Sequence, residues 1–325
     1  MHKVKSYMLG FVAIIMVSWP VRLVPPGTVL PEQISLYQIV DDDICLKVVR
    51  DSALYREGWD TLLQPVFWRR MMKIGPDTSI VNIAKTREIV GMIPTANWAY
   101  KSKKAKKAYE DSVRKTYGLK RKDEIFFTSG RSHFYQFEKV LRSVDKAIEV
   151  FTEEQTDPWY AQAILLIESP GRMQFSTDGA YGAFQLMEGV AKEVGLIIND
   201  TIDERQDFVK SAQGAARLIN RVCIPHTRAI CEKYNLSYNE SDIWFRLLVM
   251  HVYHAGARNV ARVIRKINPK EGGVQLIQEV WKTKSRRFGN ASQNYSQITI
   301  ASLLEFDELI QTQGIICPPK EELIP

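Results

Sequence analysis

The chain has 325 residues and a mass of 37.3 kDa, about twice the usual length of one domain, so we expect two folded parts. Hydrophobic residues make up 45% and charged residues 25% of the sequence, with 18 Gly and 14 Pro, which excludes a collagen-like, low-complexity or wholly disordered protein. Lys and Arg exceed Asp and Glu by 44 to 37. Ten Lys/Arg and four Asp/Glu fall within residues 101–124, so the basic excess is local.

The first 24 residues have the pattern of an export signal. Lys3 and Lys5 precede an apolar run over residues 8–19, and Pro20 follows. The run is short for a membrane-spanning helix but suits the apolar core of a secretory signal. We therefore predict a signal peptide or signal anchor over 1–24 and export to the cell envelope, most simply to the periplasm. An uncleaved anchor stays an alternative because no small-x-small cleavage site follows.

Residues 25–127 are predicted to form a smaller N-terminal region of short helices, whose role the sequence does not indicate. Its apolar clusters are separated by Pro65, Gly75-Pro76 and Pro94, residues typical of helix ends and turns. The basic segment 101–124 predicts a helix with a solvated face. The alternative is binding to an anionic wall polymer or a membrane surface. We find no sequence motif for nucleic-acid binding. Strong salt dependence of binding by the segment 101–124 would favour a polyanionic partner.

From residue 128 to 305 the sequence predicts a mainly α-helical domain, with a C-terminal tail over 306–325. Asp157-Pro158 predicts the start of a helix that ends at Glu168, because an N-cap followed by proline favours a helix N-terminus. Asp203 with Gln206 predicts a capping box for a later helix. The helices that we expect lie over 137–148, 158–168, between Gly182 and Gly195, from 203 to Pro225, and over 244–254.

The four cysteines, Cys45, Cys223, Cys231 and Cys317, are compatible with disulfides in an oxidising compartment. Of the possible pairs we favour a local bridge between Cys223 and Cys231. Zinc binding by these two with His226 lacks a fourth ligand at the usual spacing. His251, three residues before His254 on a predicted helix, is typical of a packing residue. We predict no metal and no cofactor.

Glu168 is the acidic residue with the most unusual setting, because it ends the apolar helix segment ILLIES. Apolar surroundings penalise the carboxylate, and the negative end of the helix dipole adds to that penalty, so both raise the pKa of the side chain. A carboxyl that stays protonated near neutral pH can donate a proton to a leaving oxygen. A solvent-facing helix end is the alternative interpretation.

Five ordered motifs share a pattern with one known family. They are Glu168-Ser169, the small-residue turn from Ser176 to Gly182, Gln185-Leu-Met187, Tyr253-His254-Ala255-Gly256, and Tyr295 within SQNYSQI. In order and spacing they resemble the soluble lytic transglycosylases, whose fold is goose-lysozyme-like. The resemblance covers residues 132–303 and implies a lysozyme-like helical catalytic domain.

The resemblance implies an enzyme that cuts the β-1,4 bond between N-acetylmuramic acid and N-acetylglucosamine in peptidoglycan strands without consuming water. Glu168 would act first as acid and then as base, which leaves a 1,6-anhydro end. The expected substrate-binding residues are Ser176, which would hydrogen-bond Glu168, Gln185 and Met187 along the groove, Tyr253 and Tyr295 around the bond that is cut, and His254 beside them. For the tyrosines and Met187, core packing is the alternative.

The sequence departs from the family pattern at two positions. His254 stands where asparagine is usual, which changes hydrogen-bond reach and adds a titratable group, and Glu188 replaces a common proline. With Asp178, Glu188 is also the nearest alternative for a second catalytic acid, although exposed positions suit both. Two other functions stay open: a lysozyme-type hydrolase on the same fold, and a catalytically silent wall-binding or secretion-associated protein.

Overall fold

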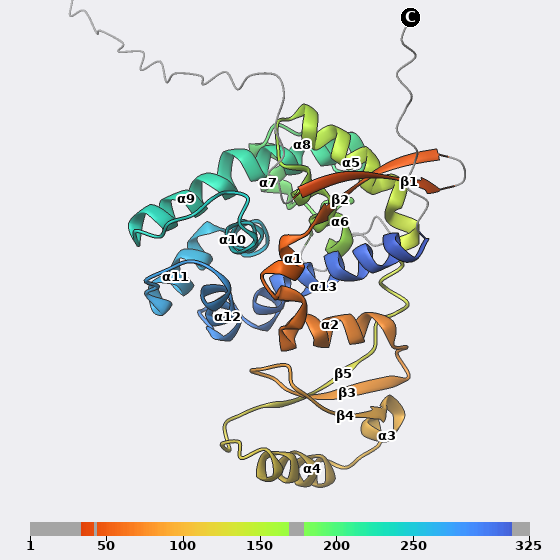
Figure 1. Ribbon diagram of the computed structural model, residues 1–325, viewed down its shortest axis with the longest axis vertical. Coiled ribbons are helices and arrows are strands. Elements are labelled where there is room, and N and C mark those ends of the chain that lie inside the picture. The colour runs from red at the N-terminus through yellow and green to blue at the C-terminus, as the bar shows by residue number, and fades with distance from the viewer. Residues whose placement is uncertain (1–33, 42–43, 169–178, 314–325) are drawn as a thin grey trace, which may run out of the picture.

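The computed structural model describes residues 34–41, 44–168 and 179–313 (Figure 1). The predicted export signal over 1–24, Ser169, Ser176, Asp178 and Cys317 therefore lie outside the described residues. Within the described ranges, no helix is both long enough and apolar enough to cross a membrane. The described part is mainly helical, as predicted for a lysozyme-like domain, and it also contains two small sheets that the sequence analysis did not predict.

The described part starts with a hairpin and short helices that pack on the larger helical body. Residues of the second strand and of the helices after it share one apolar core with the C-terminal helices. The side chain of Gln162 fastens the strand: its amide accepts a hydrogen bond from the Val49 N–H and donates one to the Val49 carbonyl, both at 2.8 Å. These elements are β1 (Ile34–Asp41), β2 (Ile44–Asp51), α1 (Ala53–Arg56), η1 (Trp59–Thr61) and α2 (Leu63–Lys73).

A small lobe lies at one end of the molecule, below α2 in Figure 1. Its three strands are antiparallel in the order β4-β3-β5. Its own apolar cluster joins Val81, Ile83 and Ile125 of the sheet to Val113 of the basic helix. The elements are β3 (Thr78–Ile83), β4 (Ile89–Pro94), α3 (Thr95–Ala99), α4 (Lys103–Thr116) and β5 (Ile125–Ser129).

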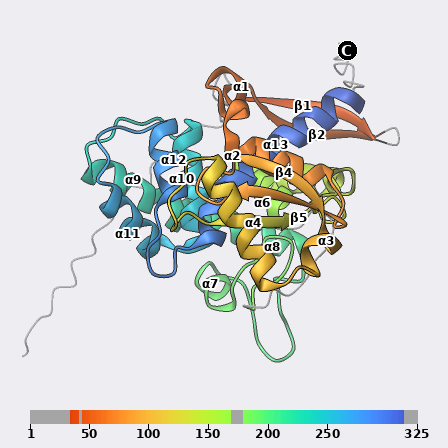
Figure 2. The same cartoon turned by 90° about the horizontal axis from the view of Figure 1, so that it is seen from below.

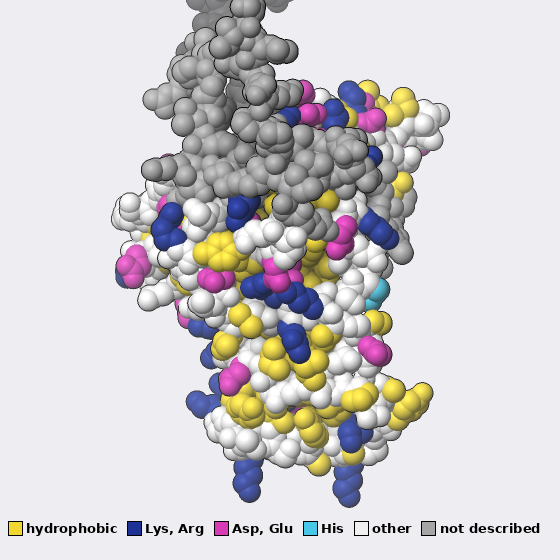
Figure 3. Space-filling model, turned by 45° about the vertical axis from the view of Figure 1, so that its right-hand side comes forward, with side chains coloured by type: hydrophobic (Ala, Val, Ile, Leu, Met, Phe, Trp, Pro, Cys, Tyr) yellow, Lys and Arg dark blue, Asp and Glu magenta, His cyan; other side chains and the backbone are white. Residues whose placement is uncertain are grey.

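The expectation of a helical N-terminal region is therefore wrong for its strands. In β3 five consecutive residues are buried, so the strand shows none of the alternation that marks a half-exposed strand. Pro94, interpreted as a break between helices, ends the edge strand β4, a position that proline tolerates. The basic segment does form a helix, and Lys and Arg side chains project from that end of the molecule (Figure 3).

The remaining helices build the larger body around a long C-terminal helix. This helix packs against α2 and against α6 (Pro158–Glu168) and α10 (Ile243–Ala255), and in Figure 2 it runs from the middle of the molecule toward the C-terminal edge. It also continues beyond residue 305, where we placed the end of the catalytic domain. The elements are η2 (Phe137–Val140), α5 (Leu141–Glu153), α6 (Pro158–Glu168), α7 (Glu188–Glu193), α8 (Phe208–Leu218), η3 (Ile219–Cys223), α9 (Ile224–Lys233), α10 (Ile243–Ala255), α11 (Ala257–Ile267), α12 (Val274–Lys282) and α13 (Asn290–Gln313).

Local signals placed several helix ends correctly. Pro158 is the first residue of α6, and an Asp157 carboxylate oxygen accepts a hydrogen bond from the Trp159 N–H at 3.0 Å. α10 ends at Ala255, before Gly256 with a φ of 79°. The predicted capping box at Asp203 is wrong, since Asp207 caps α8 through the Lys210 N–H at 2.8 Å. The predicted helix ends are correct where the capping residue contacts only its own helix.

Pro225 does not end its helix, contrary to our prediction. α8, the π-helical turn η3 and α9 follow one another directly over residues 208–233, and a π-helical turn changes the hydrogen-bonding pattern before the proline. Cys223 and Cys231 are consequently free thiols rather than a disulfide. Eight residues along a helix span about 12 Å, which is farther than the roughly 7 Å that a disulfide allows between two Cα atoms.

Arg246 of α10 joins the hairpin to the helical body. Its fully buried guanidinium donates to the Asp157 carboxylate at 2.6 and 2.9 Å and to the Ser241 carbonyl at 2.7 Å. Asp51 lies 3.4 Å away at the end of β2, and burial raises the pKa of its carboxyl to about 6. Two carboxyl groups therefore contact the buried Arg246 guanidinium. Their attraction offsets the free-energy cost of removing this cation from water.

Candidate active site

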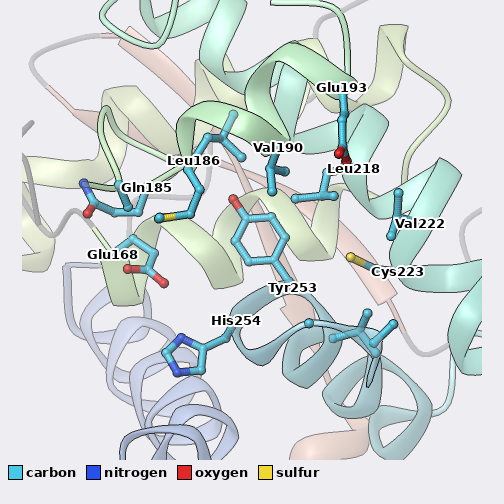
Figure 4. Close-up of a pocket in the computed structure, with 15 residues that line it drawn as sticks. Glu168, Gln185, Leu186, Val190, Glu193, Leu218, Val222, Cys223, Tyr253 and His254 are labelled. Carbon is cyan, nitrogen blue, oxygen red and sulfur yellow. The ribbon is translucent and has the colours of Figure 1, made fainter. Parts of the chain in front are cut away.

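A cleft of about 350 Å³ lies where the end of α6 meets α10, α7 and the helix from α8 to η3. Glu168 lies at one end of the cleft, Tyr253 projects into its middle, and Glu193 lies at the far end (Figure 4). Most of the wall between them is apolar. Further lining residues are Ala180, Gln185, Leu186, Met187, Val190, Leu218, Val222, Cys223, Val252, His254, Gly256 and Ala257.

Glu168 is the last residue of α6, and the ten residues before it in this helix are all buried. The helix therefore carries a carboxyl group to the cleft on a backbone that the core holds fixed. Burial raises the pKa of Glu168 to about 7, although a hydrogen bond from Tyr295 lowers it. At neutral pH a substantial fraction of this group keeps its proton, as the apolar helix segment predicted.

Tyr295 of α13 is the side chain that orients this carboxyl. Its hydroxyl donates a hydrogen bond to Glu168 Oε1 at 2.8 Å. The ring of His254 stacks on Tyr295 with a centroid separation of 4.2 Å and an interplanar angle of 16°. Burial lowers the pKa of His254, which favours the neutral imidazole against the ring. The structure thus brings Glu168, Tyr295 and His254 into one contiguous group.

Tyr253 contacts the cleft differently from Tyr295. Its hydroxyl donates to the carbonyl of Phe184 at 2.6 Å, so it holds the loop before α7 rather than the carboxyl of Glu168. The backbone of this loop turns back on itself through a bridge between Tyr181 and Leu186. Tyr253 is therefore a residue that lines the cleft and also fixes one of its walls.

Two residues of the loop, Gln185 and Met187, line the cleft as predicted for groove residues. Gln185 has a φ of 50°, and its side-chain amide donates to the Gly182 carbonyl at 2.9 Å. Met187 is 44% exposed, so the core-packing alternative does not describe it. Gly182 has a φ of 81°, and a Cβ there would lie 2.1 Å from the Arg205 carbonyl oxygen, so only glycine fits.

Arg205 is a site residue that the sequence analysis missed. It is 4% exposed, and its Nη1 donates to the carbonyls of Gly179 and Leu186 at 3.2 and 3.1 Å. Asp203 holds the guanidinium in an ion pair at 2.7 Å. The Asp203–Arg205 ion pair therefore stabilises the loop that contains Gly179 and Leu186. In the sequence we interpreted only Asp203, together with Gln206, as a capping box, and Arg205 between them was not considered.

The other acidic side chains have different settings. Glu188, the departure from the family pattern, is exposed and forms an ion pair with Lys192 at 2.7 Å, which lowers the pKa of its carboxyl. Glu193, which the sequence analysis did not single out, lines the cleft from the exposed face of α7. Among the described residues, no group of three or more His, Cys, Asp and Glu side chains is arranged to hold a metal ion.

His251 lies behind the cleft, in the core. It is fully buried, its Nε2 is 2.8 Å from the Ser296 hydroxyl, and burial lowers the pKa of its ring to about 3. Trp281 donates its indole N–H to the same hydroxyl at 2.7 Å. The packing interpretation of His251 therefore agrees with its position, and the residues of α10 that line the cleft are the three after it, Val252, Tyr253 and His254.

A mainly helical body with one partly buried carboxyl at the end of an apolar helix defines a lysozyme-like domain. The model of the transglycosylase SLT domain family matches residues 147–274, a range that contains Glu168, Gln185, Met187, Tyr253 and His254. This chain therefore carries an SLT-family domain, which implies lytic transglycosylase activity on peptidoglycan glycan strands in general. Among curated proteins, no sequence matches the chain.

Proposed function

We propose that the protein cleaves the β-1,4 bond between N-acetylmuramic acid and N-acetylglucosamine without water, with Glu168 as the sole acid and base. The observation that carries the proposal is the setting of this carboxyl. It faces a cleft, burial holds its pKa at about 7, and the Tyr295 hydroxyl fixes one of its oxygens at 2.8 Å. An acid with a pKa near the working pH is suited to both halves of a proton-transfer cycle.

In the first step, protonated Glu168 donates its proton to the glycosidic oxygen, and the bond from that oxygen to C1 of the muramic acid breaks. In the second step, the C6 hydroxyl of the same sugar bonds to C1, and the Glu168 carboxylate takes the hydroxyl proton. The two products are a fragment whose N-acetylglucosamine has a free 4-hydroxyl and a fragment that ends in 1,6-anhydro-N-acetylmuramic acid. Glu168 returns to its protonated form, so one carboxyl serves where most glycosidases use two.

The remaining side chains have supporting roles in this proposal. Tyr295 keeps the carboxyl aimed into the cleft, and His254 stacks behind it as a neutral ring. Tyr253, Gln185 and Met187 would contact the sugars along the wall. The apolar stretch suits the faces of sugar rings, because such pockets combine apolar lining with few polar groups.

The test is product analysis of purified sacculi digested with the wild-type protein and with Glu168→Gln. We expect 1,6-anhydromuramic ends from the wild type and a rate at least about 100-fold lower from the variant, since the amide cannot donate a usable proton. Glu193→Gln is the matched control, because it makes the same change at the far end of the cleft, and it should keep most of the activity. Reducing ends would instead identify a hydrolase. Binding of sacculi without product, equal in both proteins, would identify a silent wall-binding protein.

We also propose that the chain is exported to the cell envelope, with the N-terminal 24 residues as signal or anchor. The support is the sequence of this segment, where lysines precede a short apolar run, and the extracytoplasmic position of the expected substrate. Fractionation of cells that express the full chain, with N-terminal sequencing of the recovered protein, tests this. Recovery of the uncleaved chain from the cytoplasm would contradict it.

A further inference from the structure

Arg87, in the turn between β3 and β4, is a buried cation without a carboxylate partner among the described residues. It is 3% exposed and has a φ of 62°, a left-handed conformation that is rare for residues other than glycine. Its guanidinium lies 5.3 to 5.6 Å from the ring centres of Phe67, Trp68 and Phe126. The turn therefore holds a charged group inside the junction of the small lobe and the larger body.

The hydrogen bonds of Arg87 go to neutral amides. Nη1 donates to Asn82 Oδ1 at 3.1 Å, and Nη2 donates to the Oδ1 atoms of Asn290 and Asn294 at 3.0 and 2.6 Å. Nε is buried without a partner. A guanidinium has five N–H donors, so these contacts leave two unused. Neutral amide oxygens supply hydrogen bonds, but they do not neutralise the charge.

Arg87 lines a polar pocket of about 170 Å³ between the lobe and the body. The first turn of α13 lines it with Asn290 and Gln293, so the positive end of a 24-residue helix lies at the same place. Lys85 and Lys122 stand at the pocket, are exposed, and form no ion pair with a described residue. The volume corresponds to about six water molecules, which suits a small ion rather than a sugar strand.

Two further lysines of the pocket are already paired. Lys282 contacts Glu279 at 3.1 Å, and Lys284 contacts Glu124 at 3.3 Å. Asp123, the other carboxylate of the lining, accepts a hydrogen bond from the Lys120 N–H. The cations that lack a partner thus outnumber the free acidic groups at this pocket, and its field favours an anion.

We propose that this pocket binds the oxyanion of a small ligand, a phosphate or a carboxylate, with Arg87 at its base and Lys85 and Lys122 at its rim. Charge-assisted hydrogen bonds from guanidinium to such groups are strong and directional. A bound oxyanion would supply the counter-charge that Arg87 otherwise lacks. This pocket shares no lining residue with the cleft at Glu168, and anion binding in it does not depend on the proposed function.

The test is isothermal titration of the full chain with inorganic phosphate and, separately, with glutarate, with chloride added to keep the ionic strength constant. We expect saturable binding with one-to-one stoichiometry to at least one probe. The probe that binds more tightly identifies whether the site prefers phosphate or carboxylate. In the double variant Lys85→Ala/Lys122→Ala, which changes only exposed side chains, the Kd should rise at least about tenfold through the loss of charge-assisted contacts.

Arg87→Gln should abolish binding, and its thermal unfolding shows whether the variant folds. The matched control is Lys103→Ala/Lys107→Ala, which removes the same charge from α4, and its Kd should equal that of the wild type. No saturable binding of either probe to the wild type would overturn the proposal. Equal loss of affinity in the two double lysine variants would also overturn it, because the effect would then be one of net charge. Both readouts are independent of turnover, so failure here leaves the proposed function untouched.

Discussion

Two adjacent residues of α13 contact two buried ionisable groups in different regions. Tyr295 donates a hydrogen bond to Glu168 in the cleft, and Asn294 accepts one from Arg87 at the lobe junction. Neither group has an oppositely charged partner among the described residues. Burial shifts both pKa values toward the neutral form, to about 7 for Glu168 and to about 10 for Arg87.

The difference is that only one of the two groups can lose its charge near neutral pH. Glu168 takes up a proton, and this makes it a candidate acid. Arg87 stays charged, so the protein solvates it with amide oxygens and aromatic rings instead. Burial of a charged group without a counter-charge thus favours a proton donor in the cleft, because Glu168 can become neutral. At the junction it favours a candidate anion site, because Arg87 cannot.

The largest effect on stability should come from Arg246, a third buried charge that does have carboxylate partners. Arg246→Met leaves the buried Asp51 and the partly buried Asp157 without their cation, so we expect the free energy of unfolding to fall by about 3–5 kcal/mol. Arg87→Met leaves only neutral amide oxygens without their hydrogen-bond donor, so the free energy of unfolding should fall by about 1–2 kcal/mol. Urea denaturation of both variants measures the two losses. Equal losses would contradict the distinction between paired and unpaired cations.

Glu168 should reduce stability in its ionised form. Its pKa rises from 4.5 in the unfolded chain to about 7 in the folded one, so between these values the folded state binds more protons and stability falls as pH rises. Glu168→Gln should therefore be more stable than the wild type at about pH 8, by roughly 3 kcal/mol. The difference should vanish near pH 4, where both side chains are neutral.

Thermal unfolding of the two proteins across this pH range measures the effect. Glu193→Gln is the control, because its carboxyl lies on the exposed face of α7 and its loss should change stability little. If wild type and Glu168→Gln had parallel stability curves at all pH values, the raised pKa of Glu168 would be contradicted.

Tyr295→Phe should shift the pH dependence of activity by a smaller amount. The Tyr295 hydroxyl lowers the pKa of Glu168, so its removal raises that pKa, by about one unit for a hydrogen bond to a charged group. Activity that needs protonated Glu168 falls as pH rises through this pKa, and in the variant this fall should occur at higher pH. The pH profile of kcat/KM measures it. Tyr253→Phe, which loses a bond to the Phe184 carbonyl instead, should leave the profile in place.

The smallest effect should come from the basic helix α4. Lys103 and Lys107 are exposed and form no ion pair with a described residue, so Lys103→Ala/Lys107→Ala should change the free energy of unfolding by no more than about 0.5 kcal/mol. Retention of the variant on sacculi, measured against salt concentration, separates the two interpretations of this segment. A reduced salt dependence indicates contact with an anionic wall polymer, and an unchanged one indicates a solvated face.

The sequence by itself determined the elements whose signals are local. Asp157-Pro158 marks the start of α6, and Gly256 marks the end of α10, because caps and backbone conformations depend on a few neighbouring residues. The raised pKa of Glu168 was also predictable, since the apolar residues just before it and the negative end of its helix dipole both disfavour the carboxylate. Family motifs added the groove residues Gln185 and Met187, which the structure places in the cleft.

The tertiary structure decided everything that depends on contacts between distant segments. Tyr295 and Glu168 are 127 residues apart in the sequence, and Arg87 and Asn294 are 207 residues apart. No local sequence pattern predicts either contact. The sheet of the small lobe was missed for the same reason, because strand pairing stabilises a segment through partners elsewhere in the chain. Local propensity sets where a helix begins and ends, but only packing selects which buried charges meet a partner and which remain without one.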